Sequence, residues 1–367
     1  MIMVPALRPA MSPAMSNRAS QTAINFDSLV SMLFAASEPG AWYDPSDMST
    51  LFQDSAGTTP VTAVEQPVGR LLDKSGNGHH AIQATTTKRP IYSRRVNLLL
   101  GSTTLATQSI TTRSAAHKLV FSGTGSVTLS GTATGVYGAG VHSITTTAGA
   151  LTLTVSGSVQ DASFHLAVDS HLVYQGINTA TDYDADPAKF PGYLRFDGVD
   201  DALSTSSINF TGTDKMTVWA GVTKLSNAVA VILELSADWN YNSGSFLVFN
   251  NAASFTYNSA SSGSSAVNPG HIAQSIAGEV NTSVLAITHD IPGDLSTIRR
   301  NGIPGVNGIV DKGAGSFGNY PLYIGARAGT SLYFNGRLYG LIVRGAQSSL
   351  LQIEATELYM NKKVGIA

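Results

Sequence analysis

The densest group of possible metal ligands in the sequence is F-D-G-V-D-D, which contains Asp197, Asp200 and Asp201. Carboxylates are hard oxygen ligands, so these residues are candidates for binding calcium. Their spacing is not that of an EF-hand loop, and aspartates beside glycine also form turns by bonding their own backbone. The sequence therefore allows two interpretations of this cluster, a calcium site and a structural turn. Further aspartates precede it at Asp182, Asp184 and Asp186.

A second polar segment, D-K-S-G-N-G-H-H, holds Asp73, Asn77 and His79. The same two interpretations apply to it. Its glycines, serine and asparagine are typical turn residues. We therefore expect these side chains to organise a turn.

Residues that could carry out hydrolysis are few. Glycoside hydrolysis requires two carboxylates across the scissile bond, and Glu234, in V-I-L-E-L-S, is the only glutamate inside an apolar strand. The histidines are scattered apart from the pair His79-His80, and neither G-x-S-x-G nor H-E-x-x-H occurs. We therefore predict that the protein is not an enzyme.

Aromatic and asparagine residues interleave in D-W-N-Y-N-S-G-S-F-L-V-F-N-N, a pattern found in sugar-binding clefts. The predicted ligand contacts are Trp239, Asn240, Tyr241, Asn242 and Tyr257. The alternative is that alternate aromatics, above all Phe246 and Phe249, fill a sandwich core while the asparagines form hairpin turns.

Strands must position these residues. The chain contains 36 glycines, with Thr, Ser, Val and aromatic residues between them, which is typical of strands joined by tight turns.

A net charge of −2 offers no basic surface for nucleic acid, and the lack of cysteine excludes disulfides. No stretch approaches the ~20 apolar residues that cross a bilayer. Prolines interrupt the N-terminal segment where a signal peptide needs an apolar run.

The chain divides into four parts by composition and periodicity. The parts are an extended N-terminal arm (1–25), a helix over 26–37 and the first strands of a sandwich (26–96), an inserted small sandwich (97–168), and the remainder of the large sandwich with a C-terminal helix (169–367). The helix is expected to begin at Ser348 or Ser349. In the insert, Val127 and Leu129 should face one side of a strand and Thr128 the other.

Four motifs, in order, resemble the laminin-G/concanavalin-A-like jelly-roll superfamily. They are D-K-S-G-N-G-H-H-A at 73–81, F-D-G-V-D-D at 196–201, I-R-R-N-G at 298–302 and F-N-G-R-L-Y-G-L-I-V at 334–343. Together with A-W-Y-D-P-S-D at 41–47 and the insert, they are similar to jelly-roll proteins of tailed bacteriophages. The resemblance covers roughly 40–365 and implies an all-β jelly roll, a fold in which calcium sites occur. The E-x-D-x-x-E strand of concanavalin-like glucanases is missing, which argues against a glycosidase.

The resemblance implies a bacteriophage virion structural protein, a capsid decoration, fibre or tail-associated protein. Its lectin-like jelly roll would serve attachment to a host-surface glycan or particle assembly, and the small sandwich, with few aromatics, would be a spacer or assembly contact. The arm would bind other virion proteins, and the chain would form a homodimer or homotrimer. The protein would be in the virion, and extracellular after host lysis. The alternative is a free carbohydrate-binding, lectin-like adhesin.

Overall fold

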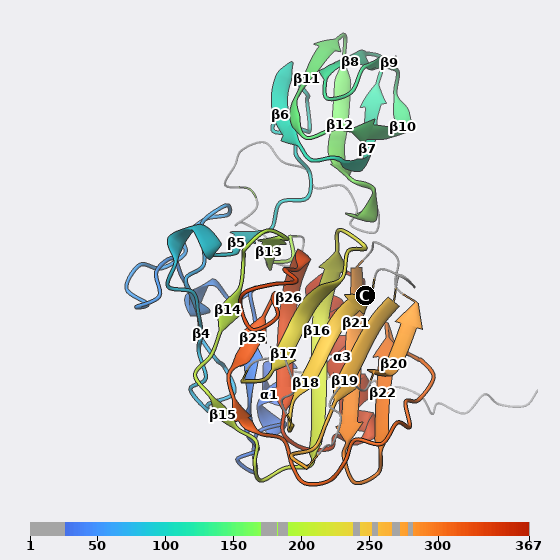
Figure 1. Cartoon of the computed structure of the whole chain (residues 1–367). Coiled ribbons are helices and arrows are strands. Elements are labelled where there is room, and N and C mark those ends of the chain that lie inside the picture. The colour runs from blue at the N-terminus through green and yellow to red at the C-terminus, as the bar shows by residue number, and fades with distance from the viewer. Residues whose placement is uncertain are drawn as a thin grey trace, which may run out of the picture.

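The computed structural model describes residues 26–169, 182, 190–237, 243–251, 256–265, 272–277 and 282–366. Strands dominate these residues and form a large sandwich, with a small sandwich standing at one end of it (Figure 1). This confirms the predicted all-β class with a jelly-roll sandwich, an inserted smaller sandwich and a C-terminal helix. Among the residues described, no helix combines the length and apolar character that crossing a membrane requires.

The first sheet of the large module has eight strands, with the longest at its centre. In spatial order they are β23 (Ile303–Pro304), β22 (Leu295–Arg300), β21 (Thr282–Asp290), β16 (Lys215–Lys224), β26 (Asn335–Arg344), β13 (Tyr193–Asp197) and β5 (Ile91–Ser93), and β1 (Gly40–Tyr43) also pairs with β26. Both faces of β16 and β26 are buried, which explains why their sequences are nearly continuous apolar runs.

The second sheet has nine strands and faces the first. In spatial order they are β2 (Leu51–Phe52), β3 (Arg70–Leu71), β4 (Ala81–Ile82), β14 (Leu203–Ser204), β25 (Leu322–Ile324), β17 (Ala230–Leu235), β18 (Phe246–Asn251), β19 (Thr256–Ser261) and β20 (Ile272–Ala277). A separate ladder joins β15 (Ile208–Asn209) to β24 (Asn319–Tyr320). Short 3-10 turns lie at η1 (Met48–Thr50), η2 (Thr86–Lys88) and η3 (Ala167–Asp169).

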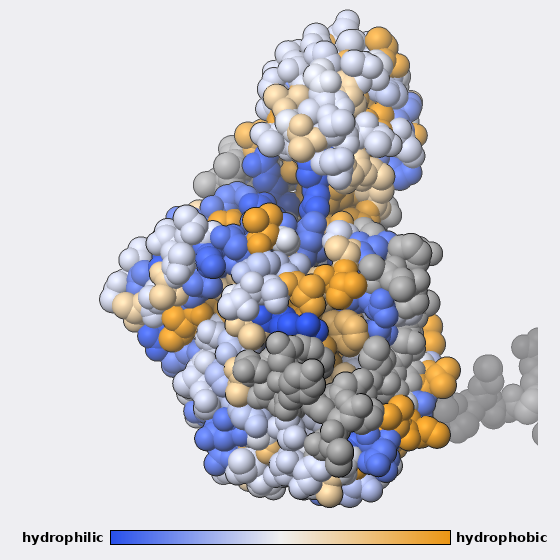
Figure 2. All heavy atoms as spheres, in the orientation of Figure 1, coloured by the Kyte–Doolittle hydropathy of each residue, from blue (hydrophilic) through white to orange (hydrophobic). Residues whose placement is uncertain are grey.

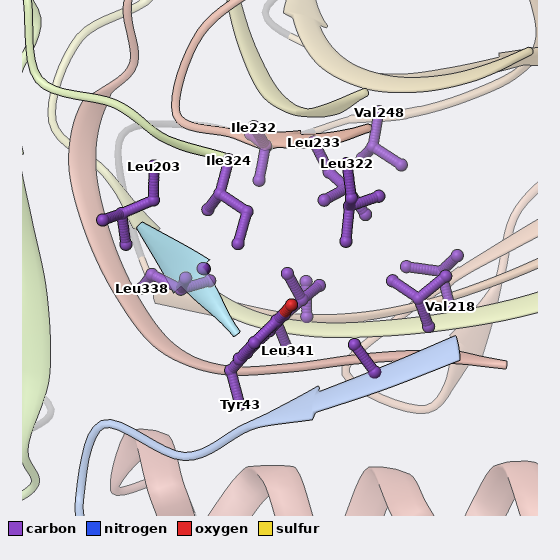
Figure 3. Close-up of a cluster of buried hydrophobic side chains, with 14 of the residues drawn as sticks. Tyr43, Leu203, Val218, Ile232, Leu233, Val248, Leu322, Ile324, Leu338 and Leu341 are labelled. Atoms are coloured by element: carbon purple, nitrogen blue, oxygen red, sulfur yellow. The ribbon is translucent and has the colours of Figure 1, made fainter. Parts of the chain in front are cut away.

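The main core lies between the two sheets. Figure 3 shows side chains from both layers pointing toward one another, with Val218 and Leu341 on the first sheet and Ile324 and Val248 on the second. All four are fully or almost fully buried. Burial of large aliphatic side chains stabilises the fold by about 1.5–3 kcal/mol each, so this layer holds the two sheets together.

Two helices cover the outer face of the first sheet. Helix α3 (Leu350–Val364) begins after Ser349, whose side chain accepts a hydrogen bond from the Gln352 backbone in a capping box, which confirms the predicted start. Helix α1 (Phe26–Met32) is shorter than the predicted 26–37, because turns follow it and Ser37 adopts a left-handed backbone, φ 61°, just before β1. Apolar residues of both helices pack in one cluster with Trp42 and Trp219 of the sheet.

The small module contains two sheets that share no strand with the large module. Its strands are β10 (Gly140–Thr146), β7 (Ala115–Gly123) and β12 (Val159–Leu166) in one sheet, and β6 (Gln108–Thr112), β11 (Gly149–Ser156), β8 (Ser126–Gly131) and β9 (Gly135–Tyr137) in the other. The side chains of Val127 and Leu129 are buried and that of Thr128 is exposed, as their alternation predicts. This module therefore has its own hydrophobic core.

Candidate functional site

Of the five residues in the predicted aromatic and asparagine site, the structure describes only Tyr257. Trp239, Asn240, Tyr241 and Asn242 lie outside the described residues. Tyr257 lies on β19, and its side chain is fully buried between the two sheets. Burial raises the pKa of its hydroxyl to about 12. We therefore correct its assignment as a ligand contact: the alternation along β19 turns this ring inward, into the core.

The acidic cluster forms one compact turn that begins at the last residue of β13, Asp197. Carboxylate oxygens of Asp197, Asp200 and Asp201 all lie within 4.8 Å of one another. The backbone N–H of Val199 donates to Asp197 Oδ1 at 2.8 Å, and the N–H of Asp197 donates to Asp201 Oδ2 at 3.0 Å. These bonds show turn chemistry, while the same turn brings three carboxylates together.

The electrostatics of this turn are unfavourable for three negative charges. Asp201 is only 5% exposed. Burial, followed by the neighbouring charge of Asp197, raises its pKa to about 7, against the lowering effect of the hydrogen bond from the Asp197 backbone. A divalent cation would neutralise this repulsion, and carboxylates suit calcium, which takes 6–8 oxygen ligands. The three residues fit part of such a ligand shell.

The second polar turn is structural. Asp73 Oδ1 accepts hydrogen bonds from the backbone N–H groups of Trp42 at 2.9 Å and Ser75 at 2.8 Å. Asp73 Oδ2 accepts from the N–H of His79 at 3.0 Å and from the Ser75 hydroxyl at 2.8 Å. The amide of Asn77 donates to the carbonyl of Gly40 at 3.0 Å. The carboxylate of Asp73 thus organises the chain, as the turn interpretation predicts.

Glu234, the candidate for catalytic chemistry, lies on β17 and is fully buried. The hydroxyl of Ser236 donates a hydrogen bond to its Oε1. Burial lowers the pKa of Arg327, and the nearby charge of Glu234 opposes this shift. These contacts give Glu234 a structural role in the sheet.

The connection between the two modules contains polar groups that sequence reasoning missed. Asp169, at the end of η3, receives two hydrogen bonds from the guanidinium of Arg337 on β26, one of them at 2.9 Å, and both side chains are buried. Burial alone would lower the pKa of Arg337, but the charge of Asp169 raises it well above the usual range. Arg113 of the small module also donates to Asn335 of β26 at 3.1 Å. We call this set of contacts the neck.

The neck could have been suspected from one signal. Arg337 lies in the apolar run F-N-G-R-L-Y-G-L-I-V, and a buried charge requires a partner. The partner, Asp169, is 168 residues away in the sequence, so pattern alone does not identify it.

Comparison with known proteins gives distant structural likenesses. No family model matches the sequence, and no curated protein matches it. A sialidase of Trypanosoma rangeli in complex with the inhibitor DANA is 13% identical, with a TM-score of 0.34, over 46% of this chain and 27% of that one. A CBM40 module of the Ruminococcus gnavus IT-sialidase bound to α2,3 sialyllactose is 17% identical, with a TM-score of 0.31, over 40% of this chain and 83% of that one.

The NanB sialidase of Streptococcus pneumoniae is 16% identical, with a TM-score of 0.32, over 38% of this chain and 23% of that one. This chain thus spans about a quarter of the length of the sialidases that it matches. The assignment of the fold rests on the strand pairing of the chain itself. By that pairing, the protein is an all-β protein whose larger module is a jelly-roll sandwich.

Proposed function

We propose that the protein is a structural attachment protein of a tailed bacteriophage particle, which presents a lectin-like jelly roll for host-surface glycan attachment or particle assembly. The observation that carries the proposal is the neck, because its buried ion pair holds the small module at a set position on the end of the large one. A rigid pair of modules suits display on a particle, where the second module must be held away from the anchored body.

The surface of the small module supports a role in contact with other copies or virion proteins. Thr128 and Ser130 on β8 and Thr154 on β11 are exposed, and Figure 2 shows mostly pale residues of intermediate hydropathy on the face in view. Flat strands with uncharged hydroxyl side chains stay soluble and can pack against an equivalent face. The proposed assembly is a homodimer or homotrimer.

A binding role without catalysis is part of the same proposal. Glu234 is buried and bonded to Ser236, and the acidic turn of Asp197, Asp200 and Asp201 is a candidate for a cation and not a pair of carboxylates on opposite walls of a cleft. Both observations support a protein that recognises its ligand and leaves it intact.

Anchoring by residues 1–25, which lie outside the described residues, is tested by deletion. Particles would be purified from lysates that express either the whole chain or a chain lacking residues 2–24, and the protein would be quantified in each. We expect the whole chain in the particle and the shortened chain free in the lysate. Equal incorporation of both chains would contradict the anchoring role, and absence of the whole chain from particles would favour a free lectin-like adhesin.

A further inference from the structure

A cleft of about 470 Å³ lies between the two modules, beside the neck. Figure 1 places β5 and β13 at the end of the large module that carries the small one, on the side of β6. The volume lies within the range of ligand-binding clefts, which occur preferentially at domain interfaces. The lining residues used below are Glu65 and Arg195 of the large module, and Leu100, Gln108, Ile110 and Thr111 of the small one.

One wall of the cleft carries a pair of opposite charges that are open to solvent. Arg195 Nη2 lies 3.0 Å from Glu65 Oε2, and the two side chains are 41% and 39% exposed. The hydroxyl of Ser93 donates to Glu65 Oε1 at 2.6 Å. These bonds hold the carboxylate in one orientation, and each group keeps hydrogen-bonding capacity toward the cleft, since a guanidinium has five donors and a carboxylate about four acceptor positions.

The backbone of Glu65 is strained. Its φ is 65°, in the left-handed region that glycine and asparagine occupy more readily. A turn alone would be satisfied better by glycine. Residues with a side chain in this region occur preferentially at functional sites, where the side chain is needed. This turn places the Glu65 side chain in the lining of the cleft.

The opposite wall comes from the small module. Thr111 is exposed on β6, and Leu100 and Ile110 add partly exposed apolar surface. The side-chain amide of Gln108 donates to the carbonyl of Leu100 at 2.8 Å and accepts from its N–H at 3.0 Å. This pair satisfies the backbone N–H and carbonyl of Leu100.

We propose that this cleft binds an uncharged, hydroxyl-rich glycan segment. Glu65 accepts hydrogen bonds from two hydroxyls of one sugar, Arg195 donates to a neighbouring oxygen, and Leu100 and Ile110 contact the apolar face of a ring. An acidic sugar is disfavoured, because the carboxylate of Glu65 repels it and both arginines of the lining already have acceptors: Arg195 pairs with Glu65, and Arg95 donates to the backbone carbonyls of Asn97 and Leu98. The inference rests on the proposed attachment function and gives that function a site and a class of ligand.

The test is calorimetric titration of the full chain with neutral oligosaccharides (maltohexaose, cellohexaose, laminarihexaose and chitohexaose) and with one acidic one, oligogalacturonate. The cleft variants are Glu65→Gln, Arg195→Met and Thr111→Trp. We expect the wild type to bind at least one neutral probe. Each cleft variant should bind that probe at least about tenfold more weakly, because Glu65→Gln and Arg195→Met each lose a charge-assisted hydrogen bond and Thr111→Trp blocks access to the cleft. The matched control is Glu354→Gln, which removes a half-exposed carboxylate of α3 that pairs with Arg299 of β22.

A further variant separates binding from folding. Glu65→Gly removes the carboxylate and relieves the backbone strain, and this relief offsets part of the loss of the hydrogen bond from Ser93, so we expect a protein that still folds and no longer binds. Thermal unfolding of each variant identifies any that fail to fold.

Three results would overturn the proposal: no neutral probe binds, the cleft variants bind as tightly as the control, or oligogalacturonate binds better than every neutral glycan. Adsorption of particles to host cells is measured in parallel. Unchanged adsorption with variants in the cleft means that the cleft assignment fails and the attachment function stands. If particles that lack the protein adsorb to host cells as well as complete particles do, the proposed attachment function itself is wrong.

Discussion

The charge state of Asp201 gives a stability prediction with a defined sign. The pKa of this carboxyl is raised from 3.8 to about 7, chiefly by burial and then by Asp197. Between about pH 4 and pH 7 the folded protein therefore holds a proton on Asp201 that the unfolded chain releases, so the contribution of this group to stability is complete below about pH 4 and is lost as the pH rises to about 7. At about 1.4 kcal/mol per pKa unit the loss reaches roughly 4 kcal/mol. Because Asp197 is exposed and water screens its charge, we expect about 2 kcal/mol.

The variant Asp201→Asn tests this reasoning. Its amide oxygen can still accept the hydrogen bond from the Asp197 backbone, but it does not ionise. In urea unfolding with a chelator present, we expect the variant to be about 2 kcal/mol more stable than the wild type at pH 8 and equally stable near pH 4. A variant that is less stable than the wild type at pH 8, or a difference in stability between the two proteins that does not change between pH 4 and pH 8, would refute the reasoning.

The same pair of proteins separates the two interpretations of the acidic turn. If the turn binds calcium, adding calcium at about a hundred times its dissociation constant should stabilise the wild type by about 2.7 kcal/mol and leave Asp201→Asn nearly unchanged. Asp54→Asn, which alters a turn aspartate outside the cluster, should respond like the wild type. A wild type that does not respond to calcium would show that the cluster is only a turn.

Two further predictions concern the core and the neck. His289 is fully buried between the hydroxyls of Ser259 and Ser296, and burial lowers its pKa to about 3. Stability should therefore fall by roughly 2 kcal/mol between pH 6.5 and pH 5, as the unfolded chain takes up a proton that the folded one refuses, and His289→Asn should flatten this slope in urea unfolding. Asp169→Asn leaves the buried charge of Arg337 without its carboxylate and should cost about 3–5 kcal/mol. In thermal unfolding, the double variant Asp169→Leu with Arg337→Met should recover most of that loss.

The elements that the sequence predicts well are those determined by local chemistry. The C-terminal helix starts at Ser349 because a capping box at its first turn is encoded within four residues. The inward and outward faces of β8 follow from strict alternation. The end of α1 was less predictable, because the left-handed Ser37 is not a residue type that marks such a turn.

Features that depend on tertiary contacts were harder to derive. Tyr257 and its asparagine neighbours fit two arrangements, and only the register of β18 with β19 decides that the ring points into the core. The acidic turn was found from its composition, but the raised pKa of Asp201 depends on burial that the motif does not reveal. Glu65 and Arg195 are distant in sequence and meet only because β13 pairs with β5 beside the turn that holds Glu65.

The neck and the cleft are physically coupled. Each module contributes one wall of the cleft, so the distance between Thr111 and Glu65 depends on how the modules are joined. For a carboxylate on one wall and apolar side chains on the other to contact the same sugar, their relative positions must be fixed to within about half an ångström. The buried pair of Asp169 and Arg337 supplies such a constraint, because a displaced neck would expose or unpair a charge at a cost of several kcal/mol. Rigidity between modules and recognition in the cleft are thus two consequences of the same ion pair, although neither of its residues lines the cleft.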